Sequence, residues 1–131
     1  MAISNIHETL LMYTKQKSMI NEKLSTVMMN ILSSSRQTAE NQSKYNDKQQ
    51  ELYFNYYYDN PDEYMIQTEE LEREHELELA NINSWEKELE LQKNNFETKL
   101  NEITTFENSW TKLLQTNIKN DFSYGDRKSV V

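Results

Sequence analysis

Apolar side chains recur at alternating steps of three and four residues through the first half of the chain. The series is strongly apolar as far as Ile31, with Lys17 as the one interruption, and it becomes polar over residues 34–41. Its members are Ile3, Ile6, Leu10, Tyr13, Lys17, Ile20, Leu24, Val27, Ile31, Ser34, Thr38, Asn41, Tyr45, Lys48 and Leu52. This heptad spacing is typical of a helix that packs in a coiled coil. It predicts a helix over residues 4–57.

A second series of the same kind occupies the other half of the chain. Successive members are three or four residues apart. They are seven or eight residues apart where a polar residue occupies the position between them. The members are Leu71, Leu79, Ile82, Trp85, Leu89, Phe96, Leu100, Ile103, Phe106, Trp110, Leu114 and Ile118. The pattern predicts a helix over residues 62–120 and a flexible tail over residues 122–131. We expect five large side chains to anchor its core face: Trp85, Leu89, Phe96, Ile103 and Trp110.

The two predicted helices are separated by the only proline in the chain, Pro61. Proline fixes φ, lacks an N–H group and disfavours the helical region for the residue before it, so the first helix must end here. Proline is also well placed at the first position of a new helix, which Asp59 or Asn60 can cap. Asp62 and Glu63 follow in the first turn, where the helix dipole favours acidic side chains. The sequence therefore predicts a turn over residues 58–61.

Because the predicted turn is short, the second helix must run back alongside the first in the opposite direction. The prediction is an all-α protein, with two long helices in an antiparallel coiled-coil hairpin over residues 1–121. Residues equidistant from Asn60 then face each other across the seam, the line of side chains between the helices. Residues 34–41 fall opposite the glutamate-rich stretch around Leu79, where we expect the seam to be weakest. The serines at 33–35 are either a weak point of the helix or small side chains that admit another backbone.

Composition supports long helices rather than a compact fold with many turns. Only 36% of the 131 residues are hydrophobic, and the chain has one Gly, one Pro and no Cys. The absence of Cys excludes disulfides and thiolate metal sites. No apolar run approaches the roughly 20 residues that cross a bilayer, and no cleavable signal peptide is recognisable. We therefore expect no membrane span, and a protein that is cytoplasmic or exported without a signal peptide.

The net charge of −8 is unevenly distributed. Residues 62–91 carry eleven acidic groups against Arg73 and Lys87, whereas residues 1–58 and 92–131 each have one basic group in excess. Nucleic acid binding requires a basic face, so this distribution argues against a nucleic acid partner. The acidic run itself wraps around the helix and is most simply a solvated segment.

Few residues have the chemistry of a catalytic or metal site. The two histidines are His7 and His75, and Glu72 precedes His75 at the spacing found in di-metal helical bundles. The spacing occurs once, and the facing stretch offers only Glu40, so we predict no metal and no cofactor. A single glycine excludes a glycine-rich phosphate loop. Paired catalytic carboxylates need a pocket that a two-helix hairpin does not provide, so we predict no enzymatic activity.

Two groups of apolar residues extend beyond the seam and are candidate interfaces. Around Val27 the apolar stripe widens, because Met28, Met29 and Leu32 add a second face, which indicates a second neighbour for this helix. The other group is six aromatic residues near the turn: Tyr53, Phe54, Tyr56, Tyr57, Tyr58 and Tyr64. They form either a small cluster that closes the hairpin or a contact surface for another subunit. The sequence favours neither interpretation over the other.

The layout, with Asp59-Asn60-Pro61-Asp62 joining two helices and no cysteine, resembles the helical-hairpin subunits of type III secretion and flagellar export systems. Needle subunits of that kind polymerise through both helices, and coiled-coil stalk proteins of the same machines contact the export ATPase. The resemblance implies a structural subunit that packs with copies of itself or with other helical proteins. Two alternatives remain open: a cytosolic coiled-coil adaptor or chaperone with one partner, and a structural component of a virion.

Overall fold

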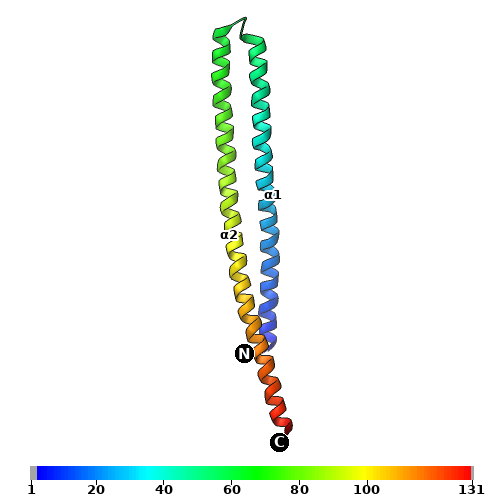
Figure 1. Cartoon of the computed structure of the whole chain (residues 1–131). Helices are drawn as coiled ribbons and strands as arrows, with labels where there is room; N and C mark the ends of the chain where they lie inside the picture. The colour runs from blue at the N-terminus through cyan, green and yellow to red at the C-terminus, as the bar shows by residue number, and fades with distance from the viewer. Residues whose placement is uncertain (1–2, 131) are drawn as a thin grey trace. The chain divides into compact units, whose positions relative to one another are not determined.

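The computed structural model describes the backbone of residues 3–130 and the side chains of residues 3–120. It contains two helices, α1 (Ile3–Tyr56) and α2 (Pro61–Val130), and no strand within the described residues. The helices pack against each other in opposite directions, on either side of one turn (Figure 1). The predicted all-α hairpin is confirmed.

The turn forms as the sequence predicts, and Asn60 caps α2. The Glu63 backbone N–H donates to Asn60 Oδ1 at 3.2 Å, and the Tyr64 N–H donates to the Asn60 carbonyl at 3.0 Å. On the other side of the turn, the Asn60 N–H donates to the Tyr56 carbonyl at 2.9 Å. Pro61 is the first residue of α2, where its missing N–H leaves no helical hydrogen bond unmade. Asn60 thus bonds to the last residue of α1, Tyr56, and caps the first turn of α2.

The far end of α2 differs from the prediction. The helix continues to Val130, although we expected it to end near residue 120 and to give way to a flexible tail over residues 122–131. The segment has no proline, and its one glycine, Gly125, costs about 1 kcal/mol relative to alanine, so no residue forces the helix to stop. The side chains of residues 121–131 and the whole of Val131 lie outside the described residues.

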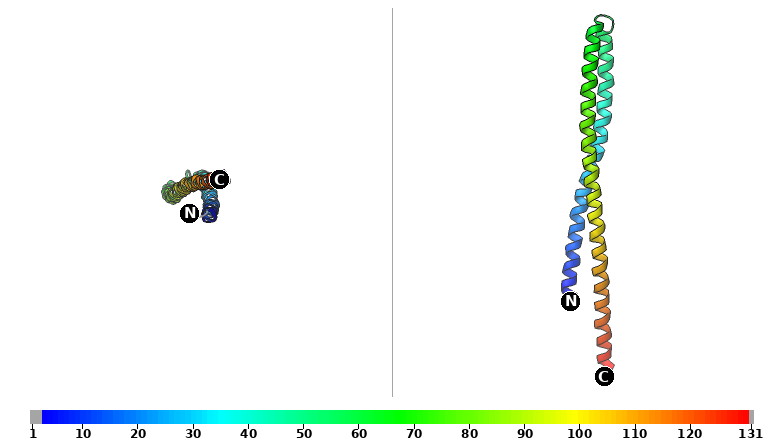
Figure 2. Two further views of the ribbon diagram at one scale, coloured as in Figure 1. Left: turned by 90° about the horizontal axis from the view of Figure 1, so that it is seen from below. Right: turned by 90° about the vertical axis from the view of Figure 1, so that its left-hand side faces the viewer.

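Two compact units make up the hairpin, and we describe each by itself. The terminal unit comprises Met1–Thr26 and Lys93–Val131, and the tip unit comprises Val27–Gln92. In the tip unit, the second part of α1 and the first part of α2 lie side by side up to the turn (Figure 2).

In the terminal unit, Ile6 is fully buried in the seam. Further along, the rings of Tyr13 and Phe106 stack with centroids 6.3 Å apart. Lys17, the basic residue that interrupts the apolar stripe, forms a half-buried ion pair in which Nζ lies 3.1 Å from Glu107 Oε1. Lys17 therefore takes part in the contact between the two helices, although it is not apolar.

In the tip unit, two cross-helix contacts define the register of the helices. Tyr45 and His75 lie fifteen residues before and after Asn60, and their rings stack with centroids 4.0 Å apart and planes inclined by 7°. The Asn41 amide donates to Glu78 Oε2. Residues 34–41 thus face the glutamate-rich stretch of α2, as the sequence predicts.

All fifteen positions of the predicted α1 stripe are buried or half-buried. On α2, Leu89 is 3% exposed. The other four predicted anchors, Trp85, Phe96, Ile103 and Trp110, are half-buried. Phe106 and Ile118, which the pattern places on the same stripe, are exposed. A third helix would be needed to cover the flanks of these large side chains.

Replacing Leu89 by alanine should lower the free energy of unfolding by about 2–5 kcal/mol, because a fully packed side chain leaves a cavity. Leu91, two residues along the same helix, is exposed and serves as a matched control. Its replacement by alanine should change stability by less than about 0.5 kcal/mol. Urea unfolding followed by circular dichroism measures both, and equal losses would contradict the seam described above.

Candidate functional site

A layer of polar side chains lies within the seam of the tip unit. Ser34 is fully buried, and its hydroxyl donates to the Ile31 carbonyl at 2.8 Å. Thr38, one helical turn further, donates to the Ser34 carbonyl at 3.1 Å. Asn41 Oδ1 and His75 Nδ1 are buried without a hydrogen-bond partner. The two unpartnered atoms, Asn41 Oδ1 and His75 Nδ1, weaken the seam, because a buried polar atom without a partner carries an uncompensated desolvation cost.

The surroundings of His75 have little capacity for chemistry. Its ring lies against Tyr45, and the adjoining cavity of about 20 Å³ has room for roughly one water molecule. Glu74 and Glu78 line this cavity with His75. Glu72, the residue at the metal-binding spacing, does not line it. Among the described side chains, no group of three or more His, Cys, Asp or Glu residues is arranged to hold a metal ion.

The first candidate interface is an apolar face on α1. Met29 and Leu32 are each 67% exposed, and Met28 is also exposed. Val27, which we grouped with them, is only 5% exposed, because it belongs to the heptad stripe and packs in the seam. It is therefore not part of an exposed surface. We call Met28, Met29 and Leu32 the methionine face.

The second candidate interface is the aromatic group beside the turn. Tyr53 contacts four other rings of the group, and Tyr57 contacts three, with ring centroids 4.6 Å from Tyr53, 5.0 Å from Tyr58 and 5.4 Å from Tyr64. The contacts with Tyr58 and Tyr64 are edge-to-face, an arrangement that aromatic rings favour. Because Tyr64 belongs to α2, the cluster joins both helices and closes the hairpin.

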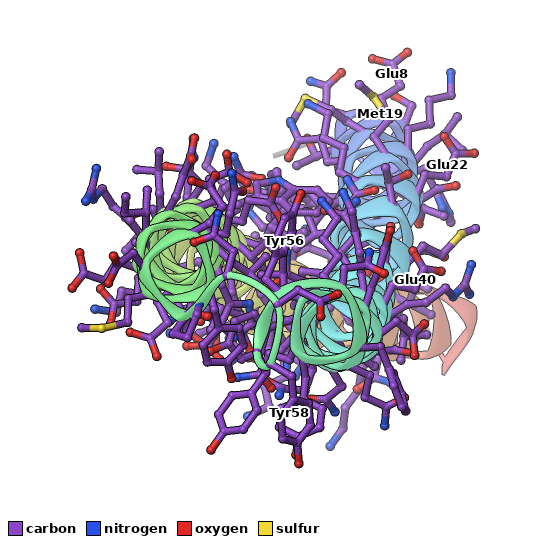
Figure 3. All side chains as sticks on the ribbon, turned by 90° about the horizontal axis from the view of Figure 1, so that it is seen from above. Glu8, Met19, Glu22, Glu40, Tyr56 and Tyr58 are labelled. Atoms are coloured by element: carbon purple, nitrogen blue, oxygen red, sulfur yellow. The ribbon has the colours of Figure 1, made fainter. Side chains whose placement is uncertain are left out.

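Closing the hairpin does not bury these rings. Phe54 is 81% exposed and Tyr58 is 79% exposed, whereas Tyr56 and Tyr64 are half-buried. Viewed along the hairpin from the turn, Tyr56 lies between the helices and Tyr58 points away from them (Figure 3). The group is thus a closing cluster with an aromatic outer surface. Its use as an interface stays a prediction.

Two tyrosine hydroxyls are held in the protonated form. A hydrogen bond with Tyr58, together with the nearby hydroxyls of Tyr58, Tyr57 and Tyr64, raises the pKa of Tyr53. The loss of hydration, followed by the negative charges of Glu72 and Glu76, raises the pKa of Tyr45. Because both shifts favour the neutral phenol, neither residue is poised to act as a base near neutral pH.

The structure also exposes apolar residues that the sequence analysis missed. Met65 and Ile66 lie in the second turn of α2 and are exposed. In the terminal unit, Met19 is exposed and borders a groove of about 420 Å³ between the two helices, which Phe106 of the predicted stripe also lines. Adjacent apolar residues off the heptad stripe, as at 65 and 66, were the signal available in the sequence.

Comparison with known proteins yields no relative. No family model matches the chain, and neither a curated protein nor a solved structure is significantly similar to it. Along the described residues, no helix combines the length and hydropathy needed to cross a membrane.

Replacing Asn41 by leucine should raise the free energy of unfolding by about 1 kcal/mol, because it removes a buried acceptor that has no partner. Its amide bond to Glu78 is lost as well, but Glu78 is exposed and regains water. Gln42 is the exposed neighbour, and its replacement by leucine is the control, with an expected change below about 0.5 kcal/mol. Thermal unfolding compares the two, and a destabilised Asn41→Leu protein would show that the polar layer is favourable.

Replacing Tyr58 by phenylalanine should lower the pKa of Tyr53 towards its ordinary value, because the hydrogen bond is lost. In the native chain the raised pKa stabilises the fold below about pH 10, and this stabilisation is lost as the pH rises through the pKa of Tyr53. Carbon NMR of tyrosine-labelled protein across an alkaline titration follows each hydroxyl. An unchanged Tyr53 titration in the variant would show that Tyr58 is not its partner.

Proposed function

We propose that this protein is a non-enzymatic structural subunit that works by packing its helices against copies of itself or against other helical subunits. The observation that carries the proposal is the imbalance between buried and exposed apolar side chains. Within the described part of the chain, three hydrophobic residues are buried, whereas seventeen large hydrophobic residues are exposed. The burial of apolar surface is the main driving force of association, so uncovered faces of this extent favour further packing partners.

The methionine face is the surface best suited to a second copy of the chain. No charged residue occurs between Lys23 and Arg36, so two such faces can approach without repulsion between like charges. Methionine side chains are flexible and adapt to the shape of an opposing surface. Two hairpins joined in this way would give each α1 a second helical neighbour.

The layout of the chain supports one particular class of assembly. Helical hairpins with a proline turn occur among the subunits of type III secretion and flagellar export machines, which the sequence resembles. A needle-like subunit would form a polymer, whereas a stalk-like subunit or an adaptor would form a discrete complex with a different protein. The exposed aromatic surface beside the turn favours a discrete complex with a different protein at that end of the molecule.

Sedimentation across a concentration series tests the proposal. The native chain should sediment faster as its concentration rises, and replacing both Met29 and Leu32 by serine should weaken this association at least roughly tenfold, because about 1 kcal/mol or more is lost with each buried side chain. Leu77 is the matched control, since it is equally apolar and exposed but lies between Glu76 and Glu78. Its replacement by serine should leave association unchanged. A native chain that stays a monomer at all concentrations would contradict packing with copies of itself.

A further inference from the structure

We propose that four aromatic residues beside the turn form a docking surface for a basic, arginine-containing segment of a different protein. The residues are Tyr53, Phe54, Tyr57 and Tyr58, which we call the tip patch. This inference goes beyond the packing of helical faces and does not depend on self-association through the methionine face.

The tip patch is a continuous surface of rings. Tyr53 contacts each of the other three, with centroid distances of 6.0 Å to Phe54, 4.6 Å to Tyr57 and 6.2 Å to Tyr58. All four side chains are exposed, Phe54 and Tyr58 most of all. Since the rings hold one another in place, a partner that binds to them restricts few additional side-chain rotations.

The segment that carries the tip patch is acidic. Between Lys48 and Arg73 the chain has no Lys, Arg or His, and the acidic residues nearest to the rings in sequence are Glu51, Asp59, Asp62 and Glu63. None of these carboxylates forms an ion pair within the described residues. Their charges are therefore available to a cationic partner.

Aromatic rings and carboxylates together favour one kind of ligand. The face of an aromatic ring attracts cations, and the planar guanidinium group of arginine also stacks on the ring. The surrounding carboxylates add attraction at longer range. Lysine provides the same charge but no planar group, so the surface should prefer arginine.

The same charges argue against a second copy of the chain at this position. Pairing two tip patches would bring together two copies of a segment whose nearest charged residues, Glu51, Asp59, Asp62 and Glu63, are all acidic. Such repulsion between like charges suppresses an interface. The methionine face has no charge to oppose pairing. The two exposed surfaces of the tip unit are thus suited to different partners.

The test measures the fluorescence anisotropy of a labelled nona-arginine peptide titrated with the full chain, and of a nona-lysine peptide in parallel. The informative variant replaces both Phe54 and Tyr58 by leucine. It keeps every charge, retains apolar side chains and removes two aromatic faces. The nona-arginine peptide should bind to this variant about fivefold or more weakly, at roughly 0.5 kcal/mol for each lost cation–π contact. The native chain should bind the arginine peptide more tightly than the lysine peptide.

Matched variants separate this surface from general attraction to an acidic protein. Replacing Glu51 by glutamine and Asp59 by asparagine should weaken peptide binding more than replacing Glu88 and Glu90 by glutamine, because the latter pair is exposed but far from the rings along α2. The Met29→Ser and Leu32→Ser variant should bind the peptide normally even where it no longer associates with itself. Circular dichroism verifies that each variant retains its helices.

Two outcomes would overturn the proposal. Equal peptide binding by the native chain and the leucine variant would show that charge alone attracts the peptide. Loss of self-association in the leucine variant, with self-association intact in the Met29→Ser and Leu32→Ser variant, would show that the tip patch binds a second copy.

Discussion

One seam of side chains between two antiparallel helices holds this hairpin together, and the rest of the structure depends on how little one seam can cover. A helix in a pair turns one stripe towards its neighbour and leaves the remaining circumference to solvent. Even the tryptophans at 85 and 110 are only half-buried. A chain with so narrow a core leaves many large apolar side chains exposed, from Leu11 to Ile118.

Polar contacts across the seam define the register of the two helices. Lys17 pairs with Glu107 in the terminal unit, and Asn41 bonds to Glu78 in the tip unit. A shift of one heptad would place Lys17 opposite Leu100 or Leu114, and Asn41 opposite Leu71 or Trp85. Every such shift leaves a polar group against an apolar one, so the native register is favoured although its polar layer is costly. The seam thus combines modest stability with a single alignment of the helices.

The two exposed surfaces of the tip unit differ in electrostatics more than in apolar character. The methionine face lies in a stretch without charge, whereas the tip patch is surrounded by carboxylates. A neutral apolar face can pair with its own copy, because association brings no like charges together. An acidic aromatic surface repels its copy and attracts cations. This contrast in charge is the basis for proposing a like subunit at the methionine face and an unlike partner at the tip patch.

The sequence by itself determined the two helices and the turn between them, whereas the cross-helix contacts of the structure set their register. The heptad stripe of α1 predicted every seam position from Ile3 to Leu52, because burial on one face imposes a helical period on the sequence. Asn60 and Pro61 predicted the turn, because their effects on the backbone are local. The end of α2 was predicted too early, because weak helix formers such as Gly125 lower helix propensity without preventing a helix.

What only the tertiary structure decided is which side of each helix is covered. Phe106 and Trp110 belong to the same predicted stripe of α2, yet Phe106 is exposed and Trp110 is half-buried. Likewise, the aromatic group could have packed entirely inside the turn, and the structure instead leaves Phe54 and Tyr58 outside it. Such differences depend on the direction of a side chain relative to a helix distant in the sequence, and no local pattern contains that direction.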